Sequence, residues 1–596
     1  MKPIRFRASS PSRNLDRISA FAGAFALVAL LFCAQAQASS FTYFEGTQHP
    51  ITVHTLHGSE PGPTVMVQGG IQGDEVAGFI TAQLLTAARV TRGTLIVVPR
   101  ANVPSIHHRV RQVNVDLNRR FDREYDDFFE DRLARVIRHL VAQSDAFIHL
   151  HEGSGFYSPT FVNDLRNPRR WGQSIIIDTD VYEETVDLSG LVQGVLARLN
   201  PLVRPASYRF ELFNTDTFSL NSIFGAEMRK TLTCHALTAH RIPALAIEVS
   251  KSISSLDWKV REQLRATVMF LEHFGVHVEP PCIEGMSFDA FAAAPPEVRV
   301  NGQRFAPGGV ITVEAGAPLR VEVATSGEDA RMAPVPGLFA EGRPLVDLTR
   351  SPHLPLEPFG SFELRSDGEL VGRATARFAG KGPDTAKEPV LFVLWHNNRL
   401  KRLAPGQVLH ALEGDQLIIE GVRGGRDEIV NIKGIVTRPG RNTGQDANVE
   451  IVLDSEMFIP RFLLKSGPDK TRIQVVRETP GARGAEFLIE LSPRRVEALR
   501  LLDPAGRTVF VAVGDSAPLL AQPGTWTLDA AWSNGEQDKL LVMADGLPLR
   551  FGETFVVGPG RHTVLNIRQA TTFKPLGEVL LAPASMAARS SQDSRS

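Results

Sequence analysis

The sequence predicts a two-part protein, an α/β domain with a mixed central sheet followed by all-β, sandwich-like modules. From about residue 40 to 280, short runs rich in β-branched residues alternate with segments whose apolar residues recur at helical spacing. Beyond residue 282 short alternating strands, separated by Pro and Gly turns, dominate. The first part is the size of one α/β domain, about 240 residues.

Length, composition and charge are those of an ordinary globular protein. The chain has 596 residues, of which 43% are hydrophobic and 22% charged. At roughly 100–200 residues per domain this length corresponds to three or four domains. The 65 Lys and Arg residues nearly cancel the 66 Asp and Glu residues. Charge therefore gives no argument for nucleic acid or an anionic membrane surface as a partner.

The first 38 residues have the pattern of a secretory signal peptide. Four arginines precede the apolar run at 20–32, and Ala-x-Ala cleavage sites follow it at Ala34/Ala36 or Ala36/Ala38. The alternative is a membrane anchor, but the run is shorter than the roughly 20 residues that a spanning helix needs. We therefore expect an exported protein with no membrane span after signal cleavage.

Two cysteines, Cys234 and Cys282, follow the predicted signal peptide. An oxidising compartment would permit a disulfide between them. Two free thiols are an equal alternative, because free cysteines are commonly buried.

The elements of the α/β part follow in a regular order. Buried strands are expected at 63–70, 93–100, 145–153 and 243–252, and helices at 75–90, 131–144 and 258–275. In the β part a strand–turn–strand pattern recurs loosely three times, which indicates a weak repeat of one unit. The expected division is a signal peptide at 1–38, the α/β domain at 39–284, β modules at 285–388, 389–484 and 485–580, and a disordered tail at 581–596.

The loop after the first buried strand contains Gln72 and Glu75, three residues apart. Two such side chains can converge on one metal ion, and the neighbouring glycines allow the backbone to bend tightly. The alternative is an ordinary turn whose acidic residues favour the start of a helix.

Two later strands end in further candidate residues. His149 and His151 are two apart, so their side chains share one face of a strand. One of them could complete a metal site; the alternative is a buried histidine with a structural partner. Glu248 ends the strand at 243–252, where a carboxylate needs a partner, for which Lys251 is a candidate.

The stretch "RQVNVDLNRRF", residues 111–121, is rich in arginine and asparagine. Planar guanidinium groups together with amide donors suit a carboxylate ligand. The alternative is a solvated basic loop.

In chain order these segments resemble the zinc carboxypeptidase (funnelin) superfamily, including its succinylglutamate desuccinylase and aspartoacylase branch. That superfamily has a His-x-x-Glu loop, an Asn-Arg pair in "DLNR-x-F", a His on a strand and a Glu on a later strand. This chain has Gln72-x-x-Glu75, "DLNRRF", His151 and Glu248 within roughly residues 45–275. Gln72 in place of His is the one departure.

The departure narrows the resemblance to the D,L-carboxypeptidases that trim peptidoglycan and set cell shape in Gram-negative bacteria. The resemblance implies Zn²⁺ as the cofactor and Glu248 as the general base. It also implies that Arg111 binds the substrate carboxylate or stabilises the oxyanion. The implied zinc ligands are Gln72, Glu75 and His151, and the implied carboxylate-binding residues are Asn118 and Arg119. Since the usual zinc ligands are Cys, His and carboxylates, the assignment of Gln72 rests on the resemblance.

The function implied is that of a periplasmic zinc carboxypeptidase acting on peptidoglycan muropeptides, with the D-Glu/meso-diaminopimelate bond of tripeptide stems as the expected cut. One alternative is an aspartoacylase-like amidohydrolase acting on a small acylated amino acid, which export and the β modules disfavour. Another is a non-catalytic cell-wall scaffold, which the retention of five site residues disfavours.

Overall fold

A computed structural model describes residues 38–288, 297–324, 333–380, 389–423, 429–437, 443–478, 484–514 and 517–583. Residues 1–37 of the predicted signal peptide and residues 584–596 of the predicted disordered tail (581–596) lie outside these ranges. The first three residues of that predicted tail are ordered, because they end the strand Pro575–Pro583.

A mixed sheet of nine strands forms the centre of the α/β domain, in the order β1-β2-β4-β3-β5-β12-β8-β11, with β13 paired to β4. The four central strands, β4, β3, β5 and β12, are all parallel to one another. Strands β2 and β13 pair antiparallel with β4, and β8 pairs antiparallel with β12. The strands are β1 (Ala38–Tyr43), β2 (Ile51–His57), β3 (Glu60–Gln68), β4 (Arg89–Val98), β5 (Ala146–Gly153), β8 (Ser174–Ile177), β11 (Glu211–Asn214), β12 (Ala244–Ser250) and β13 (His277–Glu279).

Helices cover both faces of this sheet, because its central strands are apolar on both sides. Val65 and Val67 of β3 pack into one core with α2, α5 and α8, whereas Met66 between them packs into a second core with α4 and α7. The helices are α2 (Val76–Leu85), α3 (Val103–His108), α4 (Phe129–Val141), α5 (Leu188–Leu199), α6 (Gly225–Met228), α7 (Leu232–His240) and α8 (Leu256–His273), with the 3₁₀ turns η1 (Leu117–Arg119) and η2 (Ala206–Tyr208). Short strand pairs in the loops are β6 (Phe156–Tyr157) with β7 (Arg166–Asn167) and β9 (Val181–Tyr182) with β10 (Val186–Asp187).

The first predicted helix is shorter than expected. It ends at Leu85, because Arg89–Val98 already belongs to strand β4. Val90, which continues the helical spacing, is therefore part of the sheet instead.

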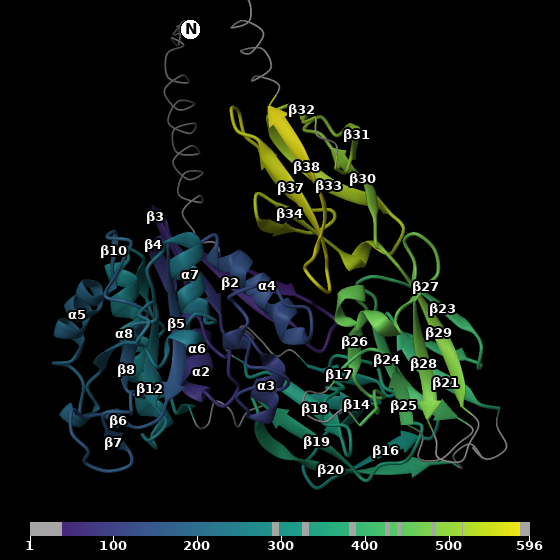
Figure 1. The fold of residues 1–596 in the computed structure, drawn as a ribbon, viewed down its shortest axis with the longest axis horizontal. Helices are drawn as coiled ribbons and strands as arrows, with labels where there is room; N and C mark the ends of the chain where they lie inside the picture. The colour runs from purple at the N-terminus through teal and green to yellow at the C-terminus, as the bar shows by residue number, and fades with distance from the viewer. Residues whose placement is uncertain are drawn as a thin grey trace, which may run out of the picture.

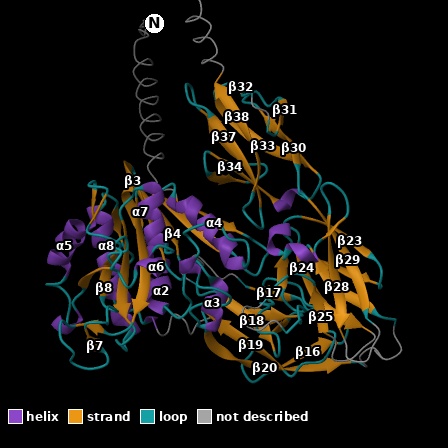
Figure 2. Ribbon diagram, viewed as in Figure 1, coloured by secondary structure: helices purple, strands orange, loops and turns teal. Residues whose placement is uncertain are grey.

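Three β units follow, each a pair of sheets around its own apolar cluster. We call them the first (298–379), second (391–492) and third (496–583) β unit. Figure 2 shows α-helices gathered in the α/β domain and strands dominating the rest, so the predicted fold class is confirmed. The strands of the first unit are β14 (Val298–Val300), β15 (Gln303–Arg304), β16 (Val310–Glu314), β17 (Val321–Val323), β18 (Pro336–Ala340), β19 (Ser361–Ser366) and β20 (Glu369–Ala379).

The second unit spans the module boundary predicted near residue 485. Strand β29 starts there and pairs with β23 and β28, so it belongs to the sheet before the boundary. The strands of the second unit are β21 (Leu391–His396), β22 (Arg399–Leu403), β23 (Val408–Leu412), β24 (Gln416–Arg423), β25 (Ile429–Ile432), β26 (Glu450–Val452), β27 (Leu464–Lys465), β28 (Thr471–Glu478) and β29 (Ala485–Ser492). Those of the third are β30 (Val496–Leu502), β31 (Thr508–Ala512), β32 (Leu519–Ala521), β33 (Gly524–Ser533), β34 (Leu540–Ala544), β35 (Leu547–Leu549), β36 (Thr554–Val557), β37 (Thr563–Gln569) and β38 (Pro575–Pro583). The other predicted divisions stay predictions.

All three β units contact the α/β domain (Figure 1). The first is held by a buried ion pair, in which the Arg100 guanidinium donates to both oxygens of Asp367 at 2.8 and 2.6 Å. In the second, the Gln416 side-chain amide donates to the Gly46 carbonyl. The third meets helix α4, where Arg135 Nη1 donates to the Thr572 carbonyl at 3.0 Å.

Two further observations concern the predictions on export. Among the helices of the described ranges, none combines the length and apolarity needed to cross a membrane. Cys234 is a buried free thiol and Cys282 an exposed one, so no disulfide joins them. Burial raises the pKa of Cys234 to about 12.

Candidate active site

The candidate ligands, the candidate base and the candidate carboxylate-binding residues predicted from the sequence, seven in all, line one pocket of about 250 Å³, as do the other two candidates, His149 and Lys251. It lies where β3, β5 and β12 end, because the carboxyl ends of parallel strands meet at one edge of a sheet. Strands β5 and β12 pair with His151 directly opposite Glu248. The loop after β3 and the stretch around η1 complete the pocket. Its lining includes Gln72, Glu75, Arg111, Asn118, Arg119, His151 and Glu248.

The loop after β3 can take this shape only because of a glycine. A Cβ atom at Gly73 would lie 2.0 Å from the backbone of Ser105 in α3, so any larger residue would push the loop away. The close approach places Gln72 and Glu75, both buried, at the edge of the sheet.

The side chains of Glu75 and His151 contact each other in the pocket. His151 Nδ1 lies 2.7 Å from Glu75 Oε2, and both side chains are buried. Burial lowers the pKa of His151, but the adjoining Glu75 carboxylate outweighs this effect and raises it.

Glu248 is partly buried in the pocket, and one of its oxygens, the buried Oε2, has no hydrogen-bond partner among the described residues. Burial raises its pKa to about 8; the neighbouring Glu75 carboxylate adds to this rise, and His151 opposes it. Lys251, the predicted partner of Glu248, makes its hydrogen bond to Asp74 instead, with Nζ 2.6 Å from Asp74 Oδ2, because the loop after β3 brings that carboxylate closer. The charge of Lys251 still acts on Glu248 and lowers the pKa of that carboxyl group. A buried carboxylate oxygen without a partner is typical of a functional group.

Asp116, within the "DLNRRF" motif, connects three of the site residues, and the sequence analysis assigned it no role. The Gln72 side-chain amide donates to its oxygens at 3.0 and 3.2 Å, and Arg111 Nη2 donates at 2.7 Å. The backbone N–H of Asn118 donates to Asp116 Oδ1 at 3.0 Å, which starts the turn η1. Its position in the sequence, between the candidate residues Arg111 and Asn118, could have indicated this role.

The contact with Asp116 determines how the Gln72 amide is oriented. A carboxylate only accepts hydrogen bonds, so the NH₂ group of Gln72 must face Asp116. The amide oxygen Oε1 is then the end that remains available to a ligand.

The other candidate substrate-binding residues are held in place by partners on neighbouring elements. Arg119 Nε donates to Glu227 at 3.2 Å, and the Asn118 side-chain oxygen accepts from the Leu232 backbone N–H at 3.1 Å. Arg111 lies nearer the acidic side of the pocket, with Nη1 4.0 Å from Glu75 Oε1.

Two polar residues next to His151 have structural roles. His149 is buried, with its Nε2 3.4 Å from Gln68 Nε2 and its ring against that of His151. Glu152 is also buried; it accepts from the Ala77 backbone N–H at the start of α2 and pairs with Lys259 at 2.6 Å.

The donor set fits a divalent cation such as Zn²⁺. An amide oxygen, a carboxylate and an imidazole nitrogen line the same pocket as Glu248, and the carboxylate and the imidazole are in direct contact. Oxygen and nitrogen donors of this kind are those that Zn²⁺ accepts, apart from the unusual amide. The sequence-based assignment of Gln72, Glu75 and His151 as ligands stays a prediction.

A second group of carboxylates could suggest a metal site but does not support one. Oxygens of Asp126, Asp454 and Glu456 lie within 4.8 Å of one another. The Lys574 ammonium already lies between them, 2.7 Å from Asp454 and 3.2 Å from Asp126, and it also pairs with Glu456. This group is an ion cluster that joins the α/β domain to the second and third β units.

Replacing Asp116 by Asn is expected to weaken metal retention about 10- to 100-fold, the usual effect of removing a group that orients a metal ligand. The neutral amide cannot accept from Gln72 and Arg111 as the carboxylate does. Dialysis against graded chelator, followed by metal analysis, measures the effect. Asp122→Asn, at an exposed position of the same segment, is the control. Equal retention in both variants would mean that Asp116 does not orient Gln72.

Comparison with known proteins finds a family model that matches the α/β domain. Residues 39–280 match the family model described as "Carboxypeptidase controlling helical cell shape catalytic". The resemblance found in the motifs is thereby confirmed, and the matched family supports carboxypeptidase chemistry for the α/β domain.

Individual relatives are more distant. The N-alpha-acetyl-L-2,4-diaminobutyric acid deacetylase of Halomonas elongata is 34% identical over 99 residues, which is 15% of this chain and 29% of that relative's length. Apo cell shape determinant protein Csd4 of Helicobacter pylori is similar with 21% identity and a TM-score of 0.45, over 74% of this chain and 100% of Csd4. The succinylglutamate desuccinylase/aspartoacylase of Rhodobacter sphaeroides is similar with 19% identity and a TM-score of 0.29, over 44% of this chain and 75% of that protein.

Proposed function

We propose that the chain is an exported zinc-dependent carboxypeptidase acting in the periplasm on peptidoglycan stem peptides. The proposed cut is the bond between D-Glu and meso-diaminopimelate in tripeptide stems, which removes the terminal residue. The observation that carries the proposal is the convergence of seven residues, from separate segments of the chain, on one pocket. The described control of helical cell shape by the matched family supports a cell-wall substrate.

In this proposal Gln72, Glu75 and His151 hold the metal. Zn²⁺ supplies a water of lowered pKa and polarises the scissile carbonyl. The Gln72 oxygen is kept available because Asp116 binds the NH₂ group of the same amide.

Glu248 is the proposed general base. Its carboxylate lines the pocket and one oxygen, Oε2, has no hydrogen-bond partner among the described residues, so the group is available to accept a proton from the attacking water. The same carboxyl group then delivers that proton to the nitrogen of the leaving amine as the amide bond breaks. One water is consumed, one new carboxylate is formed and the terminal residue leaves with a free amine.

The three basic and amide residues have two separate tasks. Arg119 and Asn118 bind the free terminal carboxylate, which explains why only the last residue is removed. Arg111, close to Glu75, stabilises the negative charge that develops on the carbonyl oxygen. Its pairing with Asp116 holds the guanidinium in place beforehand.

One observation favours a second candidate function. The 34% identity to a deacetylase of an acylated diamino acid favours hydrolysis of a small N-acyl amino acid in the same pocket. The chemistry of bond cleavage would be the same, and only the size of the substrate would differ.

Mass spectrometry of muropeptides incubated with the protein, with and without chelator, tests the proposal. We expect tripeptide stems to lose diaminopimelate without chelator and to stay intact with it. N-acetyldiaminobutyrate, tested in parallel, distinguishes the second candidate. Inactivity on both substrates in zinc-loaded protein would favour a non-catalytic scaffold and contradict the proposed function.

A further inference from the structure

The hairpin of strands β19 and β20, in the first β unit, ends against the α/β domain. Ser366 pairs with Glu369, so the turn between the strands has two residues, Asp367 and Gly368. Both have positive φ angles, 44° and 83°, as the favoured turns of two-residue hairpins require. We call residues 367–369 the hairpin tip. The described lining of the candidate active site includes none of the three.

The first residue of the hairpin tip, Asp367, binds the chain just after strand β4. It is only 1% exposed, and both of its oxygens accept from the Arg100 guanidinium. The same guanidinium also donates to the Gln83 side chain on α2. The next two backbone N–H groups after Arg100 donate to the carbonyls of Gly69 and Gly70, at 3.2 and 2.9 Å. One buried ion pair thus links the first β unit to the loop that carries two of the proposed metal ligands.

The rest of the hairpin tip packs on helix α3. A Cβ atom at Gly368 would lie 2.2 Å from the Ile106 carbonyl oxygen, so only glycine allows this approach. Glu369 Oε1 lies 3.0 Å from Arg109 Nη2, at the end of the helix. Arg111, the proposed oxyanion group, follows two residues later. The tip therefore also holds the segment that leads into the candidate active site.

Helix α3 and the residues after it support the loop after β3 directly. The Gly73 N–H donates to the Val110 carbonyl at 2.9 Å. The backbone of Ser105 lies so close to Gly73 that the space between them admits no side chain. Because Gly73 lies between Gln72 and Glu75, a shift of α3 would move both of these side chains.

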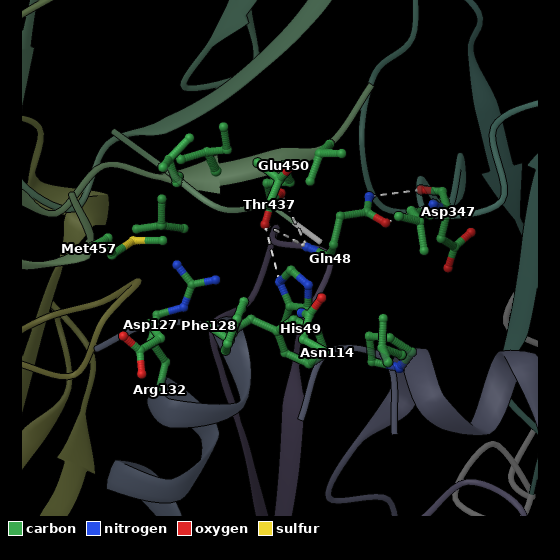
Figure 3. A pocket seen from close by; sticks show the side chains of 18 of the residues that line it. Gln48, His49, Asn114, Asp127, Phe128, Arg132, Asp347, Thr437, Glu450 and Met457 are labelled. Atoms are coloured by element: carbon green, nitrogen blue, oxygen red, sulfur yellow. Dashed lines mark hydrogen bonds and ion pairs between the residues drawn. The ribbon is translucent and has the colours of Figure 1, made fainter. Parts of the chain in front are cut away.

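A separate set of contacts attaches the first β unit to the α/β domain. Figure 3 shows the Gln48 side chain, which precedes strand β2, next to Asp347 of the first β unit. The Gln48 amide donates to the Asp347 carbonyl at 3.0 Å and accepts from the Asp347 backbone N–H at 2.7 Å. Loss of the contacts at the hairpin tip alone would therefore leave the unit attached and act locally on α3.

We propose that the hairpin tip is a positioning element for the candidate active site. Asp367 acts through Arg100, and it keeps the loop after β3 in the shape that the metal ligands need. Glu369 acts through Arg109, and it fixes the start of the segment that carries Arg111. Groups that orient metal ligands from outside the coordination sphere typically change metal affinity about 10- to 100-fold. The inference assigns a role to the first β unit, and its part that concerns zinc rests on the proposed function.

The test compares two full-length variants, each of which removes the charge of a buried carboxylate that pairs with an arginine. Asp367→Asn acts at the hairpin tip. The matched control is Glu420→Gln, at the opposite contact of the first β unit, where Glu420 of the second unit pairs with Arg343 at 3.0 Å. Both variants should lower the midpoint of thermal unfolding. Only Asp367→Asn should retain zinc about tenfold more weakly in dialysis against graded chelator.

Hydrogen exchange gives a second readout that does not depend on zinc. In metal-free protein the Gly73 amide should exchange about tenfold faster in Asp367→Asn than in the wild type, because α3 is less firmly held. In Glu420→Gln it should exchange at the wild-type rate. Should the wild type bind no zinc, the proposed function fails, and the exchange rates still decide this inference.

Wild-type zinc retention and exchange in Asp367→Asn, or equal losses in the two variants, would overturn the proposal. Should Asp367→Asn not fold, Glu369→Gln decides. The Glu369 side chain is 61% exposed, so this variant should keep the unfolding midpoint of the wild type. Its Gly73 amide should nevertheless exchange about two- to fivefold faster. An unchanged exchange rate in Glu369→Gln would contradict the proposal as well.

Discussion

Replacing Glu248 by Gln is expected to lower kcat for release of the terminal residue by about 10²- to 10⁴-fold, the range for loss of a general acid–base group. The amide keeps the shape of the side chain but can neither take a proton from water nor deliver one to the leaving amine. Because Glu248 is not among the proposed zinc ligands, metal analysis should find the zinc content unchanged. Rapid-quench or steady-state assays on muropeptides, with product quantified by mass spectrometry, measure the effect.

The control for this variant is Glu262→Gln. Glu262 is a buried glutamate that pairs with Arg265 on α8 and does not line the pocket, so its replacement should leave kcat unchanged. Unchanged turnover in Glu248→Gln would contradict the assigned base. Loss of zinc from that variant would instead assign Glu248 to the metal.

Replacing Arg119 by Met is expected to lower kcat/KM by about 10²- to 10³-fold, since truncating one partner of a hydrogen-bonded charge pair costs about 2–5 kcal/mol. The reason is that the terminal carboxylate of the substrate loses its bidentate partner. The effect should depend on that carboxylate. A stem peptide with an amidated end should be a poor substrate for the wild type and scarcely poorer for the variant.

Lys230→Met is the matched control. Lys230 is a cation that pairs with the same Glu227 as Arg119 but does not line the pocket. Its replacement should leave both substrates unaffected. A loss in Arg119→Met that is equally large for the amidated peptide would show that Arg119 supports the fold and does not read the carboxylate.

Much of the fold could be predicted because local patterns reflect burial. The unbroken apolar run at 63–70 predicts a strand covered on both faces, and Val65, Met66 and Val67 indeed divide between two cores. The helix predicted at 75–90 was too long because spacing alone cannot tell where the chain leaves a helix to pair in a sheet. The boundary near 485 has the same origin: strand pairing across β23 and β29 is non-local.

The candidate site shows the same division. The amino-acid sequence by itself determined the residue types that matter, because the side chains Gln72, Glu75, His151 and Glu248 carry the chemistry whatever their surroundings. Only the tertiary structure decided how they are used. Lys251 makes its hydrogen bond to Asp74 and not to Glu248. The Gln72 amide donates to Asp116, a carboxylate 44 residues further along the chain, and this contact leaves the amide oxygen available to a ligand. The physical reason is that hydrogen bonds and ion pairs depend on distance in space, which chain order does not encode.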